Sequence, residues 1–161
     1  MGNAHPFSSP RPGNKVLYKS QLQFDTVRAM SFYITVSSAA FKSDFPANTA
    51  TSFKFALLSR LDLRGWEVAV TEQHVFNPVK EYQTVYIVTS NLVTPRPCNN
   101  TSLPVLRIGK ISAPILQYQY VPCVAGQVDT IDINLIKVAG ADLQSGSILQ
   151  LTLHFQRRTS V

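Results

Sequence analysis

The chain has 161 residues and a net charge of +6, and its side chains are 45% apolar but only 15% charged, against about 25% charged in typical globular proteins. This length suits one domain with its own hydrophobic core. No apolar run approaches the roughly 18 residues of a transmembrane helix. The first residues also lack the charged start and apolar stretch of a signal peptide.

The low charge content leaves two interpretations open. Neighbouring subunits could cover much of the surface, or a small β domain could build its polar face from Ser, Thr, Gln and Asn. Half of the positive excess lies in the first 30 residues, where Arg11, Lys15, Lys19 and Arg28 outnumber Asp25. No run of five or six like charges is present, so we expect no nucleic-acid binding beyond weak electrostatic attraction.

Residues 1–28 are predicted to form an extended N-terminal arm, because prolines and glycine break regular structure around residues 10–13. From residue 29 onward the chain is a series of short segments with strand-like alternation of apolar and polar residues. These segments lie near 29–38, 51–58, 66–76, 81–90, 103–109, 113–122, 128–138 and 145–158. The last segment alternates most regularly, and its apolar parity consists of Leu149, Leu151, Leu153 and Phe155.

Eight strands without a long helical period indicate a sandwich or barrel. Eight is the strand count of a single jelly roll, which joins two four-stranded sheets through two Greek keys. An immunoglobulin sandwich has seven or nine strands and often a Cys–Trp–Cys order, whereas Trp66 precedes both cysteines here. We therefore predict an all-β fold, a single jelly roll (an eight-stranded antiparallel β-sandwich) over residues 29–161, with a generic sandwich as the alternative.

Residue patterns that carry catalysis are scarce. His5, His74 and His154 form no metal-binding spacing. Cys98 and Cys123 are 25 residues apart, which excludes a four-cysteine metal site, and we expect two unpaired thiols although a bridge stays open. No serine-hydrolase elbow or phosphate-binding glycine loop is present. We predict no enzymatic activity, no catalytic residues, no metal and no cofactor.

Two carboxylates share one predicted strand. Glu67 and Glu72 are five residues apart, so alternation places them on opposite faces, which does not suit an acid–base pair. Glu72 falls where the apolar parity would continue. It either pairs, with Arg107 as the candidate, or marks the point where the strand leaves the core, and we favour the second interpretation.

Two tyrosines share a parity within the predicted strand near 113–122. Tyr118 and Tyr120 alternate with Leu116 on that parity. Such a row could be a stacking platform for bases or sugars, or ordinary packing of a sheet face. We favour packing.

Three segments resemble blocks of predicted capsid-type proteins from Maverick/Polinton elements and from adintovirus- and adomavirus-like genomes. Segment 43–72 resembles F-P-x-N-T-x-x-x-F followed by an apolar strand and L-x-L-x-G-x-W-E-V-x-L-x-E, through Phe45, Pro46, Asn48, Thr49, Phe53, Leu61, Leu63, Gly65, Trp66, Glu67, Val68 and Glu72. Segment 103–111 resembles a P-L-L-R block through Pro104, Leu106 and Arg107. The C-terminal block resembles Y-x-P, an I-x-I strand, two glycines and L-H-F-x-R, through Tyr120, Pro122, Ile131, Ile133, Gly140, Gly146, Leu153, His154, Phe155, Arg157 and Arg158.

The resemblance runs in order over about residues 43–158, and it has departures. One acidic residue is missing before Trp66, a tyrosine–proline pair is replaced by QHVFNPV, and residues 1–28 match nothing in the family.

The resemblance implies a structural virion protein: a minor capsid or penton-like single jelly roll that assembles as a ring, a homopentamer, at capsid vertices. The implied partners are copies of the chain, the major capsid protein of the same particle, and a fibre or receptor. The implied location is the virion capsid, after synthesis in the host cytoplasm and assembly there or in the nucleus. We expect assembly contacts from Arg11, Lys15 and Lys19 in the arm and from Arg157 and Arg158.

Three alternatives stay open. The chain could be a jelly-roll binding module that recognises glycans or a receptor through end loops such as 91–102. It could be a capsid cement or spike-base protein. An enzyme of the cupin type is the remote alternative, because the several metal-binding histidines of that group are missing.

Overall fold

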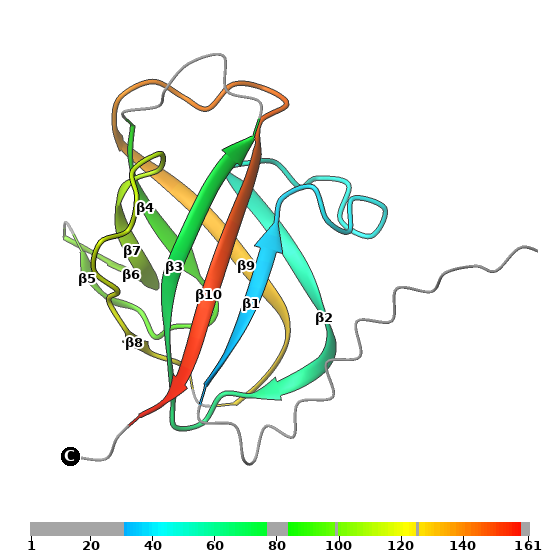
Figure 1. Cartoon of the computed structure of the whole chain (residues 1–161), viewed down its shortest axis with the longest axis vertical. Coiled ribbons are helices and arrows are strands. Elements are labelled where there is room, and N and C mark those ends of the chain that lie inside the picture. The colour runs from blue at the N-terminus through cyan, green and yellow to red at the C-terminus, as the bar shows by residue number, and fades with distance from the viewer. Residues whose placement is uncertain (1–30, 77–83, 99, 125, 159–161) are drawn as a thin grey trace, which may run out of the picture.

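The computed structural model describes residues 31–76, 84–98, 100–124 and 126–158, and within these ranges the chain forms strands and turns (Figure 1). The strands are β1 (Ser31–Ser37), β2 (Ser52–Asp62), β3 (Trp66–Phe76), β4 (Val85–Ser90), β5 (Arg96–Cys98), β6 (Thr101–Leu103), β7 (Val105–Lys110), β8 (Val121–Pro122), β9 (Gln127–Ala139) and β10 (Ile148–Arg157). The predicted arm, residues 1–28, lies outside the described residues.

Eight of these strands form two antiparallel sheets. The first sheet has the order β1-β10-β3-β8, and the second has the order β2-β9-β4-β7. The chain crosses between the sheets at most steps, so that its first and last strands are neighbours in the first sheet (Figure 1). This interleaving of two four-stranded sheets is the jelly-roll arrangement, and it confirms the predicted fold class.

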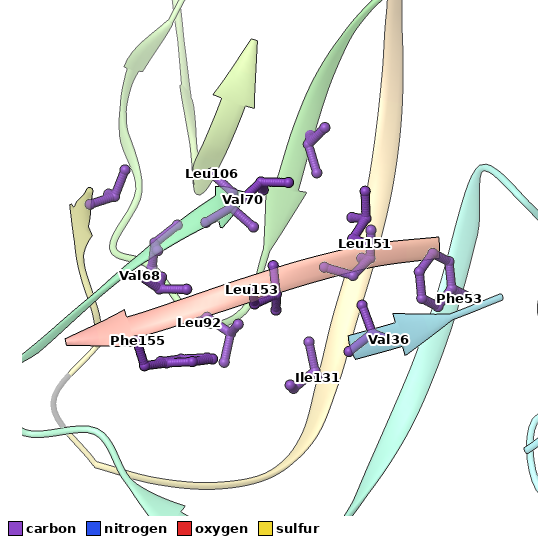
Figure 2. Packing of buried hydrophobic residues seen from close by; sticks show 14 of the residues in the cluster. Val36, Phe53, Val68, Val70, Leu92, Leu106, Ile131, Leu151, Leu153 and Phe155 are labelled. Atoms are coloured by element: carbon purple, nitrogen blue, oxygen red, sulfur yellow. The ribbon is translucent and has the colours of Figure 1, made fainter. Parts of the chain in front are cut away.

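The core lies between the inner faces of the two sheets, and β10 contributes the most regular part of it. Leu149, Leu151, Leu153 and Phe155 are fully buried, as their alternation predicts. Figure 2 shows Leu151 and Leu153 close to Val36 of β1 and Ile131 of β9. Burial of each such side chain contributes about 1.5–3 kcal/mol to the free energy of folding. The packing of β10 therefore stabilises both neighbouring strands and the contact with the facing sheet.

Aromatic rings close one end of this core. The rings of Phe32 and Phe155 stack with centroids 4.7 Å apart, and the ring of Trp66 meets Phe32 edge-on at 4.9 Å. Such ring pairs contribute about 0.5–1.5 kcal/mol each beyond the burial of their area. They join β1, β10 and β3, and Trp66, which is 1% exposed, faces the core.

A β-bulge interrupts the alternation of β3. Val70 pairs with Leu153 and Glu72 pairs with Thr152, so Thr71 is an extra residue on β3. An extra residue shifts the side-chain parity of all later positions in the strand. Val68 and Val70 therefore face the core before the bulge, whereas Gln73 and Val75 are the more buried residues after it.

The bulge overturns the prediction that Glu67 and Glu72 lie on opposite faces. The Glu67 carboxylate accepts a hydrogen bond from Gln156 Nε2 at 2.7 Å, and the Glu72 carboxylate accepts one from Thr152 Oγ1 at 3.0 Å. Both partners are on the outer parity of β10, so both carboxylates lie on the outer face of the first sheet. They are still roughly 16 Å apart along the strand, too far for an acid–base pair. Glu72 is exposed and does not pair with Arg107.

The strand predicted near 113–122 is wrong for most of its length. Only Val121 and Pro122 form β8, and residues 111–120 form an irregular segment that connects the two sheets. The alternation there does not build a sheet, because Leu116 is 90% exposed and Tyr118 is 53% exposed. The segment 91–102, named above among the end loops, contains most of a small hairpin, β5 paired with β6.

Candidate functional site

The outer face of the second sheet carries an apolar patch. Ile87 of β4 pairs with Ile108 of β7 on one side and with Ile136 of β9 on the other. The side chains at both ends of this row are 52% and 40% exposed, and Ile87 between them is 4% exposed. Val85 extends the patch along β4, and Val138, the extra residue of a β9 bulge opposite Val85, is 52% exposed beside it. We call these five residues the apolar face.

The sequence of β4 explains how this face arises. Tyr86 and Val88 point inward into the core cluster, and Ile87 between them points outward. An unbroken apolar run such as residues 85–88 of β4 is typical of a strand covered on both faces. Ile87 is buried beneath its neighbours, whereas Ile108 and Ile136 on either side of it remain partly in contact with water in the part of the chain that the structure describes.

Polar and charged side chains border the apolar face. In the next row Thr89 pairs with Asn134, whose side chain accepts a hydrogen bond from Ser52 Oγ at 2.7 Å. At the other end of β9, Lys137 and Asp142 form an ion pair with N–O separation 2.7 Å. An apolar centre with a polar rim is the composition of protein–protein interfaces.

The two predicted contact arginines at the end of β10 differ in their environment. The Arg157 guanidinium lies 4.5 Å above the Trp66 ring centre and donates a hydrogen bond to the Arg64 carbonyl at 3.1 Å. It therefore holds the turn between β2 and β3 against β10. Arg158 donates its backbone N–H to the Gly65 carbonyl at 2.9 Å, and its side chain is exposed. The other three predicted contacts, Arg11, Lys15 and Lys19, lie outside the described residues.

A second cluster lies on the outer face of the first sheet. The rings of Tyr33 and His154 stack with centroids 4.3 Å apart, and the Tyr120 hydroxyl lies 2.5 Å from His154 Nδ1. Burial lowers the pKa of His154 and raises the pKa of the Tyr120 hydroxyl. Tyr120 therefore packs against the sheet, whereas Tyr118 projects from it, and the two do not form the row that their spacing suggested.

Groups that could support metal chemistry or nucleophilic catalysis are not gathered anywhere in the described part of the chain. No cluster of three or more His, Cys, Asp and Glu side chains could hold a metal ion there. Cys98 and Cys123 are free thiols. Burial raises the pKa of the Cys123 thiol to about 12, so it is protonated at neutral pH and a poor nucleophile.

Comparisons with known proteins add no relative. No protein-family model matches the chain, no curated protein matches it, and no solved structure matches it. The fold and its surfaces define the class, a single jelly-roll β-sandwich with a partly exposed apolar sheet face. The resemblance to capsid-type proteins stays a prediction. In the part of the chain that the structure describes, no helix is long and apolar enough to span a membrane.

Proposed function

We propose that this protein is a structural subunit of a virus-like capsid, and that copies of it associate through the apolar face into a ring at the capsid vertex. The observation that carries the proposal is the apolar row Ile108–Ile87–Ile136 on the outer face of the second sheet, whose two end members are 52% and 40% exposed. A jelly roll whose sheet face meets a different surface of the next copy makes a head-to-tail contact, and such contacts form a ring when the rotation between copies closes.

The apolar face contributes a limited amount of binding free energy. Burying the remaining exposed half of Ile108, Ile136 and Val138 yields about 2–4 kcal/mol for each subunit. Micromolar association requires about 8 kcal/mol, so the polar rim and further surfaces must contribute. Ring formation of the isolated chain is therefore expected to depend on protein concentration. The low content of charged residues agrees with a surface that subunits cover.

The experiment is the solution mass of the full chain by light scattering. Five copies of the 17.9 kDa chain give about 90 kDa, and we expect this species to grow with protein concentration. The double variant Ile136→Glu/Val138→Glu is expected to remain a monomer, because two charges would be buried at the contact. Leu58→Glu is the matched control: Leu58 is 78% exposed on β2, outside the apolar face, and should leave assembly unchanged.

Two results would contradict the proposal. One is a wild-type monomer at every concentration up to the solubility limit. The other is a ring that survives the double variant. Circular dichroism of each variant verifies that the fold is retained.

A second candidate function is a binding module that recognises glycans. The Tyr33 ring favours it, because it is 57% exposed and is held by its stack on His154, and an exposed aromatic ring is a suitable surface for a sugar. A glycan array probed with wild type and Tyr33→Ala tests this candidate. Glycan binding by the wild type that is lost in the variant would support this function. If the wild type binds no glycan on the array, the candidate function is wrong.

A further inference from the structure

A pocket of about 280 Å³ opens at the side of the sandwich. Val70 of β3 and Leu106, Arg107 and Ile108 of β7 form one wall, and the irregular segment 114–119 forms the other. Its size is just below the usual range of ligand pockets, about 300–1,000 Å³. The pocket can therefore hold one or two side chains of a partner rather than a large cofactor.

Arg107 is the charged group of this pocket. Its side chain is half-buried, and one guanidinium nitrogen, NH1, donates a hydrogen bond to Gln73 Oε1. Across the described ranges, the ion pairs involve other residues, and no carboxylate lies within 4 Å of this guanidinium. Burial lowers the pKa of Arg107, but an arginine stays charged in proteins. The site therefore holds a positive charge with a neutral partner.

The bulge in β3 positions this arginine. Because Thr71 shifts the parity of β3, Gln73 points inward, where its Nε2 donates to the carbonyls of Lys110 at 2.6 Å and Ala113 at 2.9 Å. Its remaining oxygen accepts from Arg107. The same amide thus ties the irregular segment to β7 and orients the guanidinium before any ligand arrives.

Gly109 provides the space for this orientation. A Cβ at this position would lie 3.0 Å from Arg107 NH2, so the guanidinium lies over the glycine. An alanine there would shift the end of the arginine side chain by a few tenths of an ångström, and a larger residue would displace it further. The glycine therefore supplies a second, independent way to perturb the site without removing its charge.

We propose that this pocket binds a carboxylate carried beside an apolar side chain, as at the C-terminus of a peptide. The guanidinium presents a planar fork of N–H groups that matches a carboxylate. Gln73 accepts a hydrogen bond from one guanidinium nitrogen, NH1. Leu106, Ile115 and Leu116 supply the apolar wall, and Gln117 and Gln119 supply amides that can pair with a peptide backbone. This inference does not depend on ring formation.

The experiment is ligand-observed NMR on the full chain with three probes: N-acetyl-leucyl-leucine with a free carboxylate, its C-terminal amide, and inorganic phosphate. We expect saturable binding of the free acid and at least tenfold weaker binding of the amide. Arg107→Gln should weaken binding of the acid at least tenfold. Arg96→Gln, at an exposed arginine of the β5–β6 hairpin, is the matched control and should bind as wild type does.

Gly109→Ala keeps the charge and displaces the guanidinium, so it should also weaken binding of the acid, and it keeps the test valid if Arg107→Gln does not fold. Equal binding of the acid and the amide would overturn the proposal, as would unchanged binding in both variants. If phosphate binds saturably and the peptide acid does not, the pocket binds an inorganic anion, and the proposed class of ligand is wrong.

Discussion

Two glycines flank the loop between β9 and β10, and they offer a matched pair of substitutions. Gly140 has φ +100° and Gly146 has φ +85°. A Cβ at Gly140 would lie 2.8 Å from both Cα and Oγ1 of Thr84, whereas a Cβ at Gly146 would meet nothing within 4 Å. Alanine therefore imposes a similar backbone strain at both positions but a steric overlap at only one.

The expected losses of unfolding free energy come from these two effects. A left-handed backbone conformation destabilises a residue with a Cβ by about 1–2 kcal/mol, which is the expected loss for Gly146→Ala. Overpacking adds about 1–3 kcal/mol, so Gly140→Ala should lose about 2–5 kcal/mol. Thr84 cannot yield easily, because it is 1% exposed and its Oγ1 donates to the Ala141 carbonyl at 2.6 Å.

Urea unfolding followed by the fluorescence of Trp66 measures both losses, because this residue is the single tryptophan and is 1% exposed in the fold. The midpoint should fall with an unchanged slope, which reports stability rather than a change in compactness. All samples need one protein concentration, because association would add to the apparent stability. Equal losses in the two variants would refute the overlap argument.

Two further predictions concern the core and the buried thiol. Leu153→Ala should lose about 2–5 kcal/mol of unfolding free energy, because Leu153 is fully buried. Leu58→Ala on the exposed surface should change the unfolding free energy by no more than about 0.5 kcal/mol. The urea concentrations at the unfolding midpoints measure both changes. Burial raises the pKa of Cys123 from 9.0 to about 12, so the folded state keeps a proton that the unfolded state releases. Stability relative to Cys123→Ala should therefore be constant below pH 9 and fall as the pH rises towards 12.

Alternation of apolar and polar residues predicted the strands with one covered face. β10 and β1 show this alternation because their outer side chains are polar or exposed while their inner ones pack in the core. The same rule failed near 113–122, because alternation alone does not show whether a segment has a neighbouring strand to pair with. Leu116 and Tyr118 alternate there without a sheet beneath them.

The candidate sites were harder to predict for the same physical reason. A bulge changes side-chain parity without leaving a mark in the residue pattern, so Gln73 could not be placed beside Arg107 from spacing. The apolar face had a weak signal, the unbroken apolar run in β4. That run predicts a strand covered on both sides, but it does not name the partners Ile108 and Ile136, which come from the register between strands.

The pairing of β1 with β10 also determines where anything joined to this domain is attached. Ser31 pairs with Gln156, so the chain enters and leaves the sandwich at the same pole (Figure 1). The loops 38–51 and 140–147 lie at the opposite pole. A short insertion in either loop would therefore be displayed at the end of the sandwich opposite the points where β1 begins and β10 ends.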